Sequence, residues 1–400
     1  MPAMKSIRLR PGKERSLQRR HPWVFAGSVA KGSADPGETV RIESHEGEFL
    51  AWGAYSPVSQ IRLRAWSFEQ AERIDAAFFE RRIVRAIAMR RRLAIASDAM
   101  RLVHGEADGL PGLVVDRYGD TLCAQFLSAG VERWKPVIAD ALMAASACTG
   151  LYERSDASVR EQEGLTPVSA WLRNAPGAAQ ETSLAIREQA WRLTLDVAQG
   201  HKTGYYLDQR ENRRLFAQWV RQFGCRRVFN GYSYTGGFSL AALAGGAEQV
   251  LSVDSSAPAL ARAVAHVADN GFDAARHEAL DADVNATLRH FAAQGRRFDA
   301  IVLDPPKFAA NAAQAERAAR AYKDVNRLAL GLLEPGGLLL TFSCSGGISA
   351  ELFHKIVAGA AIDAGVNGYL LQRLEAGPDH PTTLEFPEGE YLKGLAILKA

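Results

Sequence analysis

The alternation of apolar and polar residues changes character several times along the chain. Residues 7 to about 68 carry short alternating runs at 39–42, 48–53 and 60–66, separated by glycine and proline. Alternation with a period of two predicts half-buried strands, so we expect a small β-domain here. Residues 75–95 instead place apolar side chains near helical spacing with arginines elsewhere on the surface, which predicts a helix linking two domains.

The remaining three quarters of the chain show two further patterns of apolar and polar residues. Residues 98–195 mix strand candidates at 113–116 and 122–127 with one helical stretch at 134–147, which indicates a compact α+β domain. The glycines between Gly105 and Gly112 are read as turn residues in this domain. From residue 196 onward, strands at 227–230, 249–254, 298–304 and 337–342 alternate with helices, and such alternation predicts a parallel sheet with crossover helices.

The predicted fold class is therefore α/β with two smaller domains before it. We expect a β-domain at 1–75, a linker helix at 76–97, a central α+β domain at 98–195 and a doubly wound α/β domain at 196–400. A chain of 400 residues is long enough to bury more than one core.

Hydropathy and cysteine content limit the classes of protein to which this chain can belong. No run of about 18 uncharged apolar residues occurs, and the first residues lead into a charged stretch rather than an apolar signal core, so we expect a cytoplasmic protein without a membrane span. The four cysteines are widely scattered and form no CxxC pair, which predicts neither a disulfide framework nor a metal site.

The net charge of +3 conceals an uneven distribution. Residues 1–100 hold 18 Lys+Arg against 11 Asp+Glu, and the remainder holds 30 against 34. The first quarter is thus +7 and the rest −4. This basic region can contact the phosphates of a nucleic acid, or it can simply be a solvated face. The candidate RNA contacts near its start are Arg10, Lys13, Arg19 and Arg20.

Candidate ligand-binding residues lie where the predicted parallel strands end, because ligands of open α/β sheets bind outside the carboxyl ends of the strands. The first strand leads into a turn at 233–238 in which Gly236 allows close approach of a ligand to the backbone. The second ends at Asp254, which can bind the two hydroxyls of a ribose or, alternatively, cap the next helix. Asp283 follows a third strand and is a candidate for an adenine amino group, with Asp281 as its competitor.

The fourth and fifth strand ends carry the candidate reactive groups. Two prolines after Asp304 fix an extended backbone that holds Asp304 and Lys307 at the site. Cys344 follows the fifth strand, where its thiolate can be a nucleophile, although buried cysteines are usually inert. A thiolate that adds to C6 of a pyrimidine raises the electron density at C5, and Asp304 is the nearest group to assist the ring; the base that removes the C5 proton is not identified.

Six ordered motifs resemble those of the RlmI-type 23S ribosomal RNA cytosine-5 methyltransferases. They start at Arg19 (RRHPWVFAG), Gly105 (GEADGLPG), Gly200 (GHKTGYYLDQR), Tyr232 (YSYTGGF), Asp304 (DPPKF) and Phe342 (FSCS). The match runs nearly end to end. Two departures are Gly231, where relatives carry a cysteine, and the absence of a cysteine from the Asp304 motif, which leaves a mechanism with one cysteine.

The resemblance implies an N-terminal PUA β-barrel domain for RNA, a central α+β domain and a C-terminal Rossmann-like domain that uses S-adenosylmethionine (SAM). It also implies that Cys344 is the nucleophile and that large-subunit ribosomal RNA is the partner. The cofactor pocket then includes the segment from Lys202 to Arg210, with Thr203, Tyr206 and Gln209 as candidates, and the glycine-rich turn, with Tyr232 as a candidate.

Three alternative functions remain at this stage. Asp-Pro-Pro is similar to the motif of exocyclic-amine methyltransferases, although Lys307 stands where those enzymes carry an aromatic residue. A ribosome-binding protein without catalytic activity is a second alternative, and a small-molecule methyltransferase, for which a basic β-domain has no evident use, is the third. The target nucleotide and the formation of a homodimer stay open.

Overall fold

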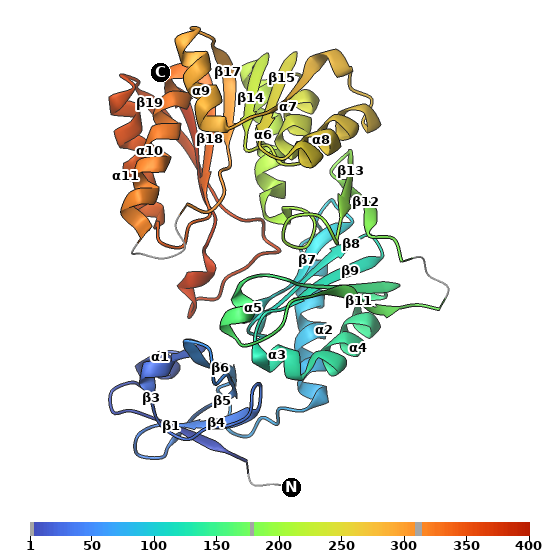
Figure 1. Ribbon diagram of the computed structural model, residues 1–400, viewed down its shortest axis with the longest axis vertical. Coiled ribbons are helices and arrows are strands. Elements are labelled where there is room, and N and C mark those ends of the chain that lie inside the picture. Colours follow the sequence, from blue (N-terminus) through green and yellow to red (C-terminus); the bar gives the residue numbers. More distant parts are fainter. Residues whose placement is uncertain (1–3, 177–179, 309–313) are drawn as a thin grey trace. The chain divides into compact units, whose positions relative to one another are not determined.

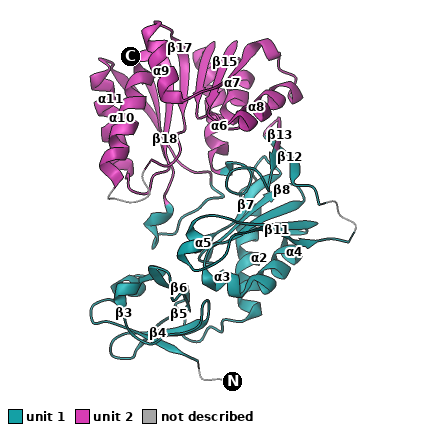
Figure 2. Cartoon of the chain, in the orientation of Figure 1, with its two compact units in different colours: residues 1–188, 195–207, 378–389 teal, residues 189–194, 208–377, 390–400 magenta. Residues whose placement is uncertain are grey.

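The computed structural model describes residues 4–176, 180–308 and 314–400. The contacts divide the chain into two compact units, coloured separately in Figure 2. Unit 1 comprises residues 1–188, 195–207 and 378–389, and unit 2 comprises residues 189–194, 208–377 and 390–400. Each unit is therefore assembled from segments that are distant in the sequence.

Unit 1 begins with a six-stranded sheet in the order β2-β6-β5-β4-β1-β3, which confirms the predicted β-domain. Its core holds the inward-facing members of each alternating pattern, such as Ile7, Val40 and Leu63, which are fully buried. The elements are β1 (Ser6–Leu9), α1 (Arg15–Gln18), β2 (Trp23–Phe25), β3 (Val29–Lys31), β4 (Thr39–Glu43), β5 (Phe49–Tyr55) and β6 (Ile61–Ser67).

The rest of unit 1 is built on a five-stranded sheet in the order β11-β10-β9-β8-β7. The strands are β7 (Ala99–His104), β8 (Leu113–Tyr118), β9 (Thr121–Phe126), β10 (Gly150–Ser155) and β11 (Val168–Asn174), and the helices are α2 (Ala76–Arg92), α3 (Ala129–Arg133), α4 (Lys135–Ser146) and α5 (Val159–Gln162). A separate two-stranded sheet joins β12 (Ser183–Glu188) and β13 (Trp191–Asp196).

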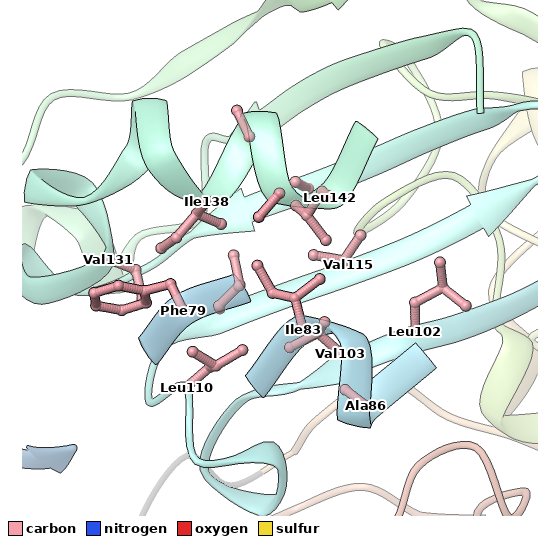
Figure 3. Packing of buried hydrophobic residues seen from close by; sticks show 14 of the residues in the cluster. Phe79, Ile83, Ala86, Leu102, Val103, Leu110, Val115, Val131, Ile138 and Leu142 are labelled. Atoms are coloured by element: carbon pink, nitrogen blue, oxygen red, sulfur yellow. The ribbon is translucent and has the colours of Figure 1, made fainter. Parts of the chain in front are cut away.

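The helix that the sequence predicts as a linker is part of this core. α2 begins after Asp75, whose side chain accepts a hydrogen bond from the Phe78 backbone N–H. Its apolar face, with Phe79 and Ile83, packs among residues of the sheet and of α4, as Figure 3 shows. The ring of Trp66 in β6 also contacts Phe79, with centroids 5.3 Å apart, so the core continues into the β-domain.

Unit 2 is a seven-stranded sheet in the order β16-β15-β14-β17-β18-β20-β19 with helices on both faces (Figure 1). Strands β14 to β18 are parallel and β20 is antiparallel to both of its neighbours, which confirms the predicted parallel α/β core. The strands are β14 (Arg227–Gly231), β15 (Gln249–Asp254), β16 (His277–Asp281), β17 (Phe298–Leu303), β18 (Leu333–Ser343), β19 (Gly368–Leu374) and β20 (Lys393–Lys399).

The helices of unit 2 are α6 (Arg210–Phe223), α7 (Gly237–Gly245), α8 (Ala257–Asp269), α9 (Val284–Ala293), α10 (Ala315–Leu332) and α11 (Ala350–Asp363). In the register of the sheet, Gly231 pairs with Leu303 and Leu303 with Thr341, so β14, β17 and β18 end at the same edge. Strand order reverses at β14, and such a switch point is where open α/β sheets bind ligands.

The 378–389 segment returns to unit 1 after the strands of unit 2. The Asp379 carboxylate accepts a hydrogen bond of 2.9 Å from the Arg101 backbone N–H, and its carbonyl oxygen accepts one of 3.2 Å from the buried Arg90. Further along, the Phe386 ring packs on Trp23 with centroids 4.8 Å apart. The segment is thus attached to both the central sheet and the β-domain of unit 1.

Within the part of the chain that the structure describes, no helix is long and apolar enough to cross a bilayer. The same residues contain no group of three or more His, Cys, Asp or Glu side chains arranged to hold a metal ion. All four cysteines are free thiols.

Candidate active site

The turn between β14 and α7 is held in an unusual backbone conformation. Tyr232, Tyr234 and Gly236 all have positive φ, at 59°, 47° and 76°. A Cβ at Gly236 would lie 2.7 Å from Cβ of Ala263 in α8, so this position requires glycine for both conformation and space. The turn that leads into α7 therefore packs tightly against α8.

Asp254, at the end of β15, fixes this turn. One carboxylate oxygen accepts a hydrogen bond of 2.8 Å from the Tyr234 backbone N–H, and the other accepts one of 3.0 Å from Ser256 N–H. Ser256 is the residue that caps α8, which excludes the capping role considered for Asp254. The side chain is only half-buried, so its carboxylate remains accessible beside the turn; the ribose contact stays a prediction.

The end of β16 contains the two carboxylates considered for adenine. Asp281 is the last residue of the strand and is exposed. Asp283 caps α9, because its side chain accepts a hydrogen bond of 2.7 Å from the Ala286 backbone N–H. Close by in the sequence, Asn285 accepts a 2.7 Å hydrogen bond from the Tyr232 hydroxyl, which ties the glycine-rich turn to α9. Burial raises the pKa of that Tyr232 hydroxyl, so it stays protonated and donates.

Two hydroxyls in the turn suit a polar ligand. Ser233 Oγ and Thr235 Oγ1 are buried and lack a hydrogen-bond partner among the described residues. A buried hydroxyl without a partner costs free energy, so a polar ligand that reaches these two hydroxyls would supply a missing partner. Together with the half-buried Asp254 carboxylate, they fit the polar parts of a nucleoside-containing cofactor.

Gln209 and Asp304 are brought together from distant parts of the sequence. Gln209 Nε2 donates a hydrogen bond of 2.9 Å to Asp304 Oδ2, and Gln209 Oε1 accepts one of 2.6 Å from Asn212 in α6. Gln209 is only 2% exposed, whereas Asp304 is half-buried just past β17. A buried amide thus sets the orientation of a carboxylate that reaches the edge of the sheet.

Cys344 directly follows β18, and its side chain is half-buried. The next residue, Ser345, connects two loops, since its hydroxyl accepts a hydrogen bond of 3.1 Å from the Phe308 backbone N–H and bonds the Tyr322 hydroxyl at 3.0 Å. The loop that carries Asp304 is thereby attached to the loop that carries Cys344. The predicted pair of reactive residues is brought to one edge of the sheet.

The other three cysteines have a different environment. Burial raises the pKa of the thiols of Cys123, Cys148 and Cys225, in the last case to about 11. Thiols of this kind stay protonated at neutral pH and are poor nucleophiles. Cys344 is therefore the best-exposed thiol and the one at the predicted site.

Two of the predicted cofactor residues belong to unit 1. Thr203 is buried, and its hydroxyl donates to an Asp116 carboxylate oxygen at 2.6 Å and bonds the Tyr118 hydroxyl at 3.0 Å. The Tyr206 ring lies 4.6 Å below the ammonium of Lys202. Thr203 thus has a structural role within unit 1, and the cofactor role of both residues stays a prediction.

The predicted RNA contacts are exposed. Arg10, Lys13, Arg19 and Arg20 lie in unit 1, where Arg20 approaches Glu69 at 3.5 Å; Lys307 is exposed on the Asp304 loop of unit 2. Arg20 also lines a cavity of about 380 Å³ in unit 1. Its other charged lining residues are Glu69, Arg82, Arg85, Glu106 and Glu385.

The sequence did not single out Tyr322 or Lys393, and it included Ser345 only as the last residue of the FSCS motif. Tyr322 and Ser345 pair across a helix and a loop, and Lys393 comes from β20, near the end of the chain, where its ammonium donates a hydrogen bond of 2.9 Å to the Ser345 carbonyl oxygen. A strand that inserts antiparallel between β18 and β19 cannot be recognised from local periodicity. For Lys393, the hint in the sequence was its position as a polar residue directly before the apolar run at 394–398.

Comparison with known proteins identifies the family to which this chain belongs. A model of S-adenosylmethionine-dependent methyltransferases matches residues 157–395, and a model of PUA-like domains matches residues 7–68. Ribosomal RNA large subunit methyltransferase I of Klebsiella pneumoniae subsp. pneumoniae is 48% identical over 394 residues, which cover 97% of this chain and 96% of that protein. The protein of the same name from Cronobacter sakazakii is 48% identical over 396 residues, covering 97% and 98%.

Solved structures show the same fold at low sequence identity. A methyltransferase crystallised with SAH has a TM-score of 0.85 at 23% identity, covering 99% of this chain and 100% of that one. A protein from Streptococcus mutans, described as a SAM-dependent methyltransferase, has a TM-score of 0.84 at 22% identity, with coverage of 99% and 100%.

Proposed function

Because the chain belongs to the ribosomal RNA large subunit methyltransferase I family of SAM-dependent methyltransferases, we propose that it methylates C5 of a cytosine in large-subunit (23S) ribosomal RNA, with Cys344 as the nucleophile. The family and the cofactor predicted from six motifs are confirmed. The observation that carries the proposed chemistry is the attachment of the Cys344 loop to the Asp304 loop through Ser345.

The proposed reaction uses the residues at the edge of the sheet. SAM supplies an electrophilic methyl group. The Cys344 thiolate adds to C6 of the cytosine, which makes C5 nucleophilic enough to accept that methyl group. Loss of the C5 proton then allows the sulfur–carbon bond to break, and the thiolate is restored. Asp304, oriented by Gln209, hydrogen-bonds the ring as its charge changes.

The cofactor contacts are proposed from the same geometry. The turn at 232–236, with the unpartnered hydroxyls of Ser233 and Thr235, receives the polar part of SAM. Asp254 binds the ribose hydroxyls and Asp283 the adenine amino group. Thr203, Tyr206 and Gln209 complete the set that the resemblance implies.

RNA is bound by exposed cations in this proposal. The PUA-like domain contributes Arg10, Lys13, Arg19 and Arg20 as phosphate contacts, and Lys307 adds one beside the reactive residues. Since the proposed substrate is ribosomal RNA, the reaction is expected in the cytoplasm. No role for a metal ion is proposed.

The proposal is tested by transferring labelled methyl from SAM to large-subunit ribosomal RNA and identifying the product nucleoside by mass spectrometry. We expect 5-methylcytosine with the wild type and none with Cys344→Ala. Cys225→Ala, which removes a buried thiol two residues before β14, should leave the activity unchanged. Activity in Cys344→Ala, or an N-methylated base, would show that Cys344 is structural.

A second experiment separates C5 chemistry from methylation of an exocyclic amine. RNA containing 5-fluorocytosine has no removable proton at C5, so a thiolate adduct persists once the methyl group has been transferred. We expect a covalent enzyme–RNA complex with the wild type and none with Cys344→Ala. An exocyclic-amine methyltransferase would form no such complex.

A further inference from the structure

Lys393 lies against the loop that carries Cys344. It is the first residue of β20, where it pairs with Ser343, the last residue of β18. Its ammonium donates a hydrogen bond of 2.9 Å to the carbonyl oxygen of Ser345, so the cation is held beside the residue that follows the cysteine. The side chain is half-buried, which reduces the screening of its charge by water.

The electrostatic relationship between the two groups has a definite sign. Burial lowers the pKa of Lys393, and the negative charge of an ionised Cys344 acts in the opposite direction and raises it. The attraction is mutual, so an ammonium at Lys393 must favour the ionised form of the thiol to the same extent. The ammonium of Lys393, whose burial costs free energy, thus lowers the free energy of the Cys344 thiolate relative to the thiol.

Other charges around Cys344 act on the same equilibrium. Lys307 lies close enough to Lys393 to lower its pKa, and as a second cation it also favours the thiolate. Asp304 opposes it. Tyr322, whose pKa is raised chiefly by burial and also by Cys344 and Asp304, stays a neutral hydroxyl bonded to Ser345. Of these groups, Lys393 is the cation that a hydrogen bond fixes to the Cys344 loop.

We propose that Lys393 is a positioning residue whose ammonium holds Cys344 in the thiolate form before RNA binds. In the ionising step the S–H bond of Cys344 breaks, the electron pair stays on sulfur and the proton passes to solvent, while Lys393 keeps its own proton. This inference rests on the proposed function, because an ionised Cys344 matters only if the thiolate is used.

The test measures the ionisation of Cys344 directly, without RNA or SAM. The full chain is treated with iodoacetamide from pH 5 to 10, and the rate of Cys344 alkylation is followed by peptide mass spectrometry. Lys393→Met removes both the charge and the hydrogen-bond donor. Lys393→Gln removes the charge and keeps an N–H donor for Ser345, and Lys393→Arg keeps both.

Lys399 is a matched control on the same strand. Its half-buried ammonium donates to the carbonyl oxygens of Leu330 and Leu333, but it lies at the other end of β20, about 20 Å of strand away. Lys399→Met therefore removes a comparable lysine without removing the charge near Cys344. Thermal unfolding of each variant checks that the fold is retained.

We expect the alkylation midpoint to rise by about one pH unit or more in Lys393→Met and Lys393→Gln, with a roughly tenfold slower reaction at pH values below the wild-type midpoint. Lys393→Arg and Lys399→Met should match the wild type. A wild-type midpoint in Lys393→Gln, or an equal rise in Lys399→Met, would overturn the proposal.

Failure of the proposed function gives a different result. If Cys344→Ala retains methyl transfer while the midpoint still depends on Lys393, the thiolate is stabilised but not used. If Cys344→Ala is inactive and the midpoint does not depend on Lys393, Cys344 is the nucleophile and another group activates it.

Discussion

Gln209 and Asp304 form a 2.9 Å hydrogen bond although they are 95 positions apart, one immediately before α6 and the other just past β17. The amide donates, so it presents a neutral group to one oxygen of the carboxylate. Asn212 holds the other end of the same amide. The orientation of Asp304 therefore depends on a side chain that comes from a different part of unit 2.

Gln209→Leu is expected to reduce kcat for methyl transfer by about 10- to 100-fold. A hydrogen bond to a charged group contributes roughly 1.5–3 kcal/mol, and without it the carboxylate loses its fixed orientation. The measurement is steady-state kinetics with labelled SAM. Gln218→Leu makes the same substitution at an exposed position of α6 and should leave kcat unchanged. Equal kcat values for the two variants would contradict this role for Gln209.

His266 should make the stability of unit 2 depend on pH. Its Nδ1 lies 2.9 Å from the Thr235 carbonyl oxygen, and its Nε2 lies 2.9 Å from the Thr194 backbone N–H and 3.0 Å from the Thr194 carbonyl oxygen. Burial lowers its pKa, so the unfolded chain binds the proton first. This contribution to stability is complete above about pH 6.5 and is lost as the pH falls through the lower folded value.

The measurement for His266 is the unfolding temperature between pH 7.5 and 5. His266→Gln should show a smaller fall in unfolding temperature than the wild type over this range. His290→Gln replaces an exposed histidine and serves as the control. A fall of wild-type size in His266→Gln would refute the prediction. Burial also lowers the pKa of His277, so some dependence on pH should remain in the variant.

Arg90→Met should destabilise unit 1 by about 3–5 kcal/mol, because it leaves the Asp108 carboxylate buried without its partner. Arg90 is 1% exposed and donates a hydrogen bond of 2.5 Å to Asp108. Calorimetric unfolding should show a transition lowered by roughly 10 °C. The double variant Arg90→Met/Asp108→Asn should recover part of this loss, and the exposed neighbour Arg91→Met should change little.

Lys13→Ala with Arg19→Ala should weaken RNA binding and reduce the slope of log affinity against log salt by about one to two. Both residues are exposed in the basic N-terminal region of the PUA-like domain. The measurement is a filter-binding titration at several salt concentrations. Arg320→Ala removes an exposed cation paired with Glu316 on α10 and should leave the slope unchanged. An unaltered slope in the first variant would exclude these two residues as phosphate contacts.

Positions that follow parallel strands could be predicted from sequence because each depends on local pattern. Asp254, Asp304 and Cys344 come directly at or after β15, β17 and β18, and the rule that ligands bind at these ends selected them. The same reasoning could not decide whether Asp254 binds ribose hydroxyls or caps α8, since the serine that caps this helix lies only two residues further on.

Groups that act across the sheet were not predictable in this way. Lys393 meets the Cys344 loop because β20 inserts antiparallel beside β18, and Tyr322 meets Ser345 because α10 packs over that strand. Both contacts depend on tertiary packing, which periodicity does not encode. Gly231 is a similar case, since a Cβ there would lie 2.9 Å from Val284 in α9, a contact that explains how a change at this position affects packing.

The 378–389 segment has a consequence for how this protein can be recombined. A genetic cut before residue 378 removes the carbonyl acceptor of Arg90 and the ring that packs on Trp23, while β20, which follows the segment, completes the sheet of the other unit. Exchange of gene fragments between relatives at a single crossover therefore produces mismatched contacts in one unit or the other. Keeping the segment with the rest of its own unit therefore requires one crossover before residue 378 and another after residue 389.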